Sequence, residues 1–174
     1  EEFRPVVLSS DDYHRGKKWL EENYGAPWTA WDDPRVYNTK ELAEDLKRLK
    51  AGESVVRQHF DFATEDVVID GEINPSPFVI VEGLYAGSPD LREVRNLHYE
   101  MPTSIATSVG RDIRRLLIEN RANGSIGTPE DRLKYVMEIA LPTYLKQKRP
   151  RANSFSMHSR PLAERAFILD RLSR

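Results

Sequence analysis

The sequence contains no cysteine. This absence excludes a disulfide framework and a thiolate zinc site, and it fits a reducing cytoplasm, which is where we expect the protein to reside. Long apolar runs are missing as well, since no stretch approaches the roughly 20 apolar residues that span a bilayer. We therefore expect no membrane partner.

A strong excess of one charge sign is also absent. The 26 Lys and Arg residues nearly balance the 28 Asp and Glu residues. This balance leaves no electrostatic footprint for nucleic acid, so we expect no nucleic-acid partner. A hydrophobic share of 39% and a charged share of 31% are those of an ordinary globular protein, and 174 residues suffice for one domain with a buried core. We predict a single domain over residues 1–174.

Apolar runs alternate with amphipathic segments along the chain. The runs Val6–Ser9 and Pro77–Glu82 predict strands buried on both faces. Periodicity and capping residues predict a helix over residues 38–50, with an Asn38/Glu41 capping box and a stop at Gly52. A further helix should begin at a Thr128 cap with Pro129 at its first position and should kink or break at Pro142. Two more helices are predicted over residues 104–121 and 162–172. The alternation favours an α/β layer fold with a mostly parallel sheet.

Acidic residues follow both predicted strands. Asp11 and Asp12 come after the first strand, and Glu82 ends the second. In parallel sheets, ligands bind beyond the carboxyl ends of the strands, where a carboxylate can take a proton from a hydroxyl or hold Mg²⁺. Asp11 or Asp12 could instead cap the next helix. The presence of acids at two strand ends favours a functional site.

Five stretches then occur in a recognisable order between about Val6 and Pro150: VVLSSDDYHRG, AWDDPRVYNTKELAEDLKRLKAGESV, QHFDF, PFVIVEGLYA and VMEIALPTYLKQKRP. In this order they resemble motifs of the uridine kinase and phosphoribulokinase family of P-loop kinases. The resemblance implies a P-loop kinase-like three-layer α/β fold with a mostly parallel sheet. It also implies an acceptor-site segment at about residues 28–77 and a small helical lid at about residues 111–130.

The resemblance implies a role for each matched acceptor-side residue. Asp11 would be the general base that takes the proton from the hydroxyl being phosphorylated, and Asp32 would bind ribose hydroxyls. Further acceptor-binding side chains would be Tyr13, His14, Phe60 and Phe62. Two alternatives stay open, because Asp32 could cap a turn before Pro34 and the two phenylalanines could belong to the core.

The phosphate side of the resemblance implies ATP and Mg²⁺. Glu82 or Asp12 would lie near the metal ion and the phosphates, and Arg115 and Arg121 would grip the triphosphate from the lid. An arginine-rich helix can equally be a solvated face. Glu65 stands where the family often has a histidine that contacts the base, so the resemblance does not fix uridine as the acceptor.

One motif that the family requires is absent. No segment matches the phosphate-binding loop G-x-x-x-x-G-K-[ST]. Because the sequence starts with Glu1 and this loop's strand lies inside the sheet in the family, we expect either a missing N-terminal strand, loop and helix or another segment in their place. Two hypotheses follow. One is an ATP-dependent kinase of a nucleoside or related sugar-containing metabolite. The other is a catalytically silent relative that binds a metabolite or regulates. Either could form a homo-oligomer.

Overall fold

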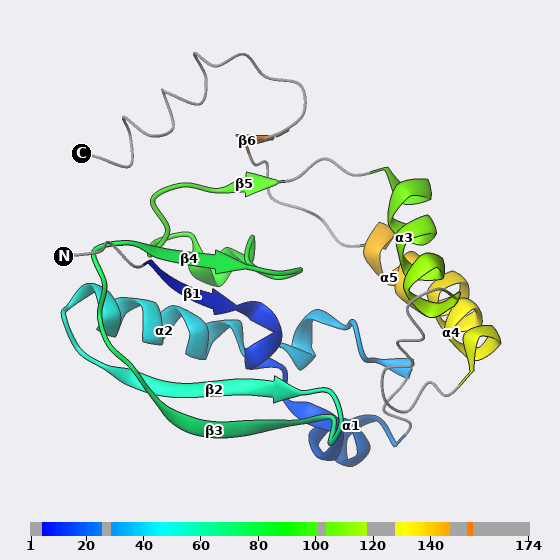
Figure 1. The fold of residues 1–174 in the computed structure, drawn as a ribbon, viewed down its shortest axis with the longest axis horizontal. Coiled ribbons are helices and arrows are strands. Elements are labelled where there is room, and N and C mark those ends of the chain that lie inside the picture. The colour runs from blue at the N-terminus through cyan, green and yellow to red at the C-terminus, as the bar shows by residue number, and fades with distance from the viewer. Residues whose placement is uncertain (1–4, 26–28, 101–103, 118–127, 147–152, 155–174) are drawn as a thin grey trace.

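The computed structural model describes residues 5–25, 29–100, 104–117, 128–146 and 153–154, and all structural statements below concern these residues. Their strands form three two-stranded sheets (Figure 1). The parallel pairs are β1 (Val6–Ser9) with β4 (Val79–Glu82) and β5 (Tyr99–Glu100) with β6 (Asn153–Ser154). The antiparallel hairpin consists of β2 (Val55–Asp61) and β3 (Asp66–Ile73). The helices are α1 (Gly16–Tyr24), α2 (Thr39–Lys50), α3 (Ile105–Leu117), α4 (Pro129–Tyr135) and α5 (Leu141–Lys146).

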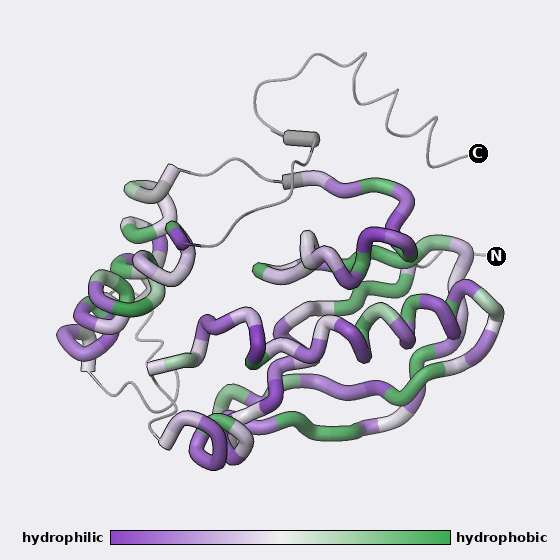
Figure 2. Tube along the Cα trace, turned by 180° about the vertical axis from the view of Figure 1, so that it is seen from behind, coloured by the Kyte–Doolittle hydropathy of each residue, from purple (hydrophilic) through white to green (hydrophobic). Residues whose placement is uncertain are grey.

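The helix α2 lies between the β1/β4 pair and the hairpin, and it supplies much of the core (Figure 1). Its apolar residues recur at helical spacing, so Leu42, Leu46 and Leu49 face the same side and are buried. They pack with Leu8 of β1 and Val55 of β2. The helices α3, α4 and α5 lie together at one side of the molecule in both views (Figures 1 and 2).

Most local predictions for the described residues are confirmed. The first strand spans Val6–Ser9 as predicted, and Gly52 follows α2 with a φ of +85°, which suits a helix stop. The hydroxyl of Thr128 accepts a hydrogen bond from the Asp131 N–H at 3.1 Å and caps α4. Residues 118–121 and 162–172, which were predicted to be helical, lie outside the described residues.

Two predicted details of the helices were wrong or incomplete. Asn38 stands at the N-cap of α2, but its side chain binds Glu41 and Arg15 and caps no backbone N–H, so the capping box does not form. Pro142 does not end its helix, because a π-helical turn at Val136–Ala140 joins α4 to α5. This turn fits a residue that cannot supply the ordinary i to i−4 hydrogen bond.

The prediction that both strands are buried on two faces was also wrong. Val7 and Ile80 are partners in the β1/β4 register, and their exposed fractions are 58% and 40%. The next residue, Leu8, is buried in the core against α2. Successive strand residues point to opposite faces, so in the described part of the chain α2 covers one face of this pair and the other remains accessible.

Gly83 lets the end of β4 approach the turn that follows β1. Its φ is +112°, and a Cβ atom at this position would lie 2.2 Å from Oγ and 3.2 Å from the backbone N of Ser10. Ser10 is 1% exposed, and its Oγ accepts a hydrogen bond from the Tyr85 N–H. The Glu-Gly sequence at the end of β4 therefore has a steric reason.

We predict that Gly83→Ala lowers the free energy of unfolding by about 3 kcal/mol or more, because it adds a collision to an unfavourable φ. Chemical denaturation measures this change. Gly71→Ala is the matched control, since Gly71 has a φ of +137° and no atom within 4 Å of its virtual Cβ. The control should cost only about 1 to 2 kcal/mol. Equal losses in the two variants would contradict the close contact with Ser10.

Candidate active site

Asp11 lies in the 3-10 turn Ser10–Tyr13 that directly follows β1. Ser9 caps this turn by accepting a hydrogen bond from the Asp11 N–H. Parallel pairing places Ser9 opposite Glu82, so Asp11 follows β1 at the same edge at which Glu82 ends β4. Burial is the largest cause that raises the pKa of Asp11, and the charges of Glu82, Asp12 and Asp32 raise it further. A carboxylate in this environment has a greater tendency to take up a proton.

The two predicted phosphate-side acids, Asp12 and Glu82, differ in their surroundings. An oxygen of Asp12 accepts a hydrogen bond from the Phe60 N–H at 3.0 Å, so this side chain ties the turn after β1 to β2. Glu82 is exposed at the end of β4. Within the described ranges, no group of three or more His, Asp and Glu residues is arranged to hold a metal ion.

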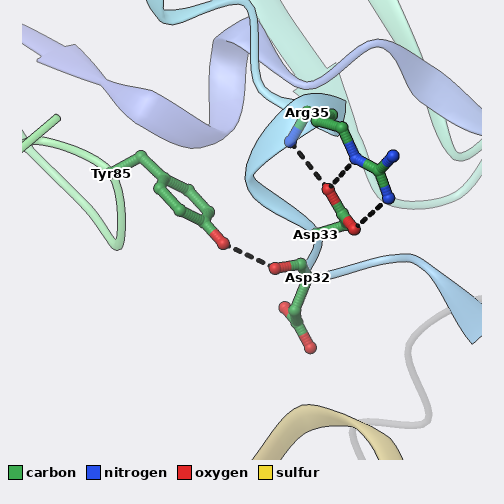
Figure 3. Close-up of polar contacts among 4 residues, drawn as sticks. All are labelled: Asp32, Asp33, Arg35 and Tyr85. Atoms are coloured by element: carbon green, nitrogen blue, oxygen red, sulfur yellow. Dashed lines mark hydrogen bonds and ion pairs between the residues drawn. The ribbon is translucent and has the colours of Figure 1, made fainter. Parts of the chain in front are cut away.

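Asp32 is held at both its main chain and its side chain. The hydroxyl of Tyr85 donates to the main-chain carbonyl of Asp32 at 2.5 Å (Figure 3). The hydroxyl of Tyr135 in α4 donates to the Oδ2 atom of Asp32. Asp33 next to it binds Arg35 through both carboxylate oxygens, which fixes the turn before α2.

His14 lies inside an aromatic cluster and is only 3% exposed. Its ring centroid lies 4.7 Å from that of Trp31, 5.1 Å from that of Tyr37 and 4.9 Å from that of Phe60. Its Nδ1 accepts a hydrogen bond from the Gly16 N–H, and Nε2 faces the Trp31 carbonyl oxygen at 3.4 Å. This pattern corresponds to the neutral ring with its proton on Nε2. Both ring nitrogens thus contact the backbone, and substrate binding by His14 stays a prediction.

Tyr13 is likewise a core residue. It is 3% exposed, and its hydroxyl donates to Asp45 of α2 at 2.9 Å. This direction leads into the core around α2, and the contact of Tyr13 with substrate stays a prediction. The two phenylalanines differ from each other. Phe60 is 6% exposed and packs on His14, whereas Phe62 is 52% exposed and lies edge-on to Phe60 at 5.1 Å.

The predicted lid arginines cannot be placed. Arg121 lies outside the described residues, and the side chain of Arg115 in α3 is among those not described. Two other arginines of α3, Arg111 and Arg114, are exposed. The exposure of these two fits the solvated-face alternative.

Sequence reasoning missed four aromatic residues around Asp32. Two of them, Trp31 and Tyr37, lie in the segment before α2. The others are Tyr85, which follows β4, and Tyr135, which ends α4. Tyr37 and Tyr85 pack with ring centroids 4.3 Å apart. Asp32 is among the charges that raise the pKa values of Tyr37 and Tyr135. The one sequence signal for this group was the position of Trp31 directly before the Asp-Asp-Pro stretch.

Comparison with known proteins finds related sequences. The inorganic pyrophosphatase TTM2 of Arabidopsis thaliana is 27% identical over 141 residues, which are 80% of this chain and 19% of that protein. Uridine kinase-like protein 4 of Arabidopsis thaliana is 26% identical over 116 residues, 66% of this chain and 24% of that protein. The uridine kinase of Staphylococcus aureus (strain JH9) is 26% identical over 154 residues, 86% of this chain and 67% of that protein. The chain thus spans about a fifth to a quarter of these plant relatives. No family model matches.

A solved structure has the same fold. The putative fructose transport system kinase from Silicibacter sp. TM1040 aligns with a TM-score of 0.68 at 17% identity and covers 88% of this chain and 76% of that one. The chain therefore has an α/β fold of the P-loop kinase type. In sequence it is related to the uridine kinases, as the order of its motifs predicted. Among the described helices, none has the length and apolar character to cross a bilayer.

The buried His14 generates a prediction about pH. Burial lowers the pKa of this imidazole from 6.5 to about 4. The unfolded chain therefore binds more protons than the folded one once the pH falls below about 6.5, so the stability contributed by neutral His14 is lost between about pH 6.5 and pH 4. At pH 5 the loss is about 2 kcal/mol relative to pH 7.5.

Denaturation at pH 7.5 and pH 5 measures this loss in the wild type and in His14→Phe. The variant lacks the titrating ring, so it should lose about 2 kcal/mol less than the wild type between the two pH values. His59→Phe is the control, because His59 is a partly exposed residue of β2 that contacts Asp70. The pair with Asp70 is exposed and contributes little, so this variant should keep most of the wild-type pH dependence. A His14→Phe profile parallel to the wild type would contradict a buried neutral His14.

Proposed function

We propose that this protein is part of an ATP-dependent kinase that phosphorylates a hydroxyl group of a nucleoside or of a related sugar-containing metabolite. The single observation that carries the proposal is the environment of Asp11, a partly buried carboxylate at a strand end with Glu82 beside it. The relationship to uridine kinases and the kinase fold support the same reaction class.

In the proposed reaction, Asp11 takes the proton of the acceptor hydroxyl. The hydroxyl oxygen then forms a bond to the γ-phosphorus of ATP while the bond between that phosphorus and the β,γ-bridging oxygen breaks, so ADP leaves. Phosphoryl transfer needs mainly positioning and charge stabilisation from the protein. Asp32 would hold a second hydroxyl of the acceptor, and Phe62 with its exposed ring would border the base or sugar.

Carboxylate oxygens are the protein ligands that Mg²⁺ prefers, and kinases commonly hold it with one or two of them plus the phosphates of the nucleotide. Glu82 suits this task because it is exposed beside Asp11, whereas Asp12 is engaged with the Phe60 N–H. Bound Mg²⁺ would offset the charge of the phosphates. No segment of the 174 residues matches the phosphate-binding loop, so the proposed transfer also needs phosphate contacts that this motif does not supply here, and the assays below use the whole natural protein.

We predict that Asp11→Asn lowers kcat by about 10²- to 10⁴-fold, because Asn cannot take the proton, while acceptor binding is retained. Transfer of labelled phosphate from Mg-ATP to uridine, cytidine and fructose measures turnover, and calorimetry measures binding. In the wild type, kcat/KM should fall as the pH is lowered through the raised pKa of Asp11, since the protonated carboxyl is inactive as a base.

Asp70→Asn serves as the matched control. Asp70 lies on the hairpin, where it contacts Arg57 and His59. Its replacement by Asn is the same chemical change, made outside the candidate site. The control should keep the wild-type kcat. An Asp11→Asn variant that turns over at the wild-type rate would refute the role of Asp11 as base.

A second function has an observation of its own. The pyrophosphatase TTM2 contains a related segment that this chain matches over only 19% of that protein's length. This favours a metabolite-binding or regulatory module without turnover, attached to another activity. In that case the wild type binds an acceptor but transfers no phosphate to any of the three, and Asp11→Asn has no turnover to lose.

A further inference from the structure

A helix from the second half of the chain contacts the acceptor side through one tyrosine. The hydroxyl of Tyr135 donates to the carboxylate of Asp32, which lies 103 positions earlier in the sequence. Tyr135 is 3% exposed, whereas Leu133 and Met137 near it are 43% and 51% exposed. The helix therefore directs a polar aromatic residue, and not these apolar ones, toward the acceptor side.

The main chain at Asp32 is fixed independently of Tyr135. Tyr85 holds the carbonyl of Asp32, and the Asp33 N–H donates to the Ala30 carbonyl at 2.9 Å. The ion pair between Asp33 and Arg35 fixes the same turn (Figure 3). In Figure 3 the carboxylate of Asp32 points away from Tyr85, toward the faint yellow ribbon of α4. The carboxylate can therefore change its partner while the turn keeps its shape.

The partner that Tyr135 provides is chemically equivalent to an acceptor group. A phenol and a sugar hydroxyl each offer one O–H donor to a carboxylate. Burial raises the pKa of Tyr135, as do the charge of Asp32 and the hydrogen bond to it, so the hydroxyl keeps its proton at neutral pH. The Arg132 guanidinium, 5.3 Å from the Tyr135 ring centroid, brings a positive charge to the same place.

We propose that Tyr135 docks α4 on the acceptor site by holding the Oδ2 atom of Asp32, and that an acceptor hydroxyl takes the position of the Tyr135 hydroxyl at this oxygen on binding. The inference rests on the proposed function, because that function makes Asp32 an acceptor-binding residue. Two donors that compete for one position at a carboxylate are coupled reciprocally. Acceptor binding therefore releases α4, and docked α4 weakens acceptor binding by the same factor.

Native-state hydrogen exchange of residues 129–146 in the natural full-length protein tests the contact. In Tyr135→Phe without ligand, amides of α4 should exchange about tenfold faster than in the wild type, since a hydrogen bond to a charged group is lost. Asp32→Asn removes the charge from the other side and should give a similar acceleration. Tyr24→Phe is the control, because it removes a hydroxyl from α1 while leaving the ring next to Trp19 and Arg35.

Uridine then serves as the acceptor probe, with cytidine in parallel. It should raise the α4 exchange rate of the wild type to that of Tyr135→Phe, and it should bind Tyr135→Phe several-fold more tightly than the wild type. Unchanged α4 exchange in Tyr135→Phe, or weaker nucleoside binding by this variant, would overturn the inference. If neither nucleoside binds the wild type, the nucleoside part of the proposed acceptor class fails, and the exchange rates without ligand still decide whether Tyr135 docks α4.

Discussion

The parallel pairing of β1 with β4 is the constraint on which the candidate site depends. It sets Ser9 opposite Glu82, so the turn after one strand meets the acid that ends the other. The absence of a side chain at Gly83 allows this close approach, because a Cβ atom there would collide with the buried Ser10. A one-residue shift of this register would turn Leu8 out of the core, so the hydrophobic pattern that stabilises the fold also fixes the place of Asp11.

This register brings like charges together, which opposes folding. Asp11 lies within electrostatic reach of Asp12, Glu82 and Asp32, and each of them raises its pKa. The surrounding structure limits the cost by giving two of these acids hydrogen-bond donors, the Phe60 N–H for Asp12 and the Tyr135 hydroxyl for Asp32. Local conflicts of this kind are typical of functional sites, where binding or chemistry takes precedence over stability.

Sequence reasoning succeeded for most local features, although the Asn38/Glu41 capping box did not form. Strand periodicity, the Thr128 cap and the Gly52 stop each depend on residues a few positions apart, and the motif order indicated the fold. It did not indicate that Tyr13 and His14 enter the core, because both were assigned to the acceptor site from the motif that contains Asp11. A 3-10 turn rotates successive side chains by about 120°, so neighbours of Asp11 point in other directions, and these two enter the core.

The residues that reasoning from the sequence missed were missed for a different reason. Tyr85 and Tyr135 reach Asp32 across 53 and 103 positions, and no local pattern encodes contacts at such separations. The errors about burial have a similar origin, since an apolar strand such as Val6–Ser9 does not reveal whether one or both of its faces will be covered.

The described residues hold the groups proposed for the acceptor side, whereas no segment of the 174 residues matches the phosphate-binding motif. This difference explains how one fold can serve either proposed function. The proposed acceptor recognition by Asp32 needs only the turn before α2 and the aromatic residues around it. The proposed phosphoryl transfer additionally needs a base. Burial and the neighbouring acids at the strand ends raise the pKa of Asp11, the residue proposed for this role. A module that only bound its ligand would gain stability by losing the repulsion between Asp11 and Glu82, so this pair favours the kinase over the silent relative.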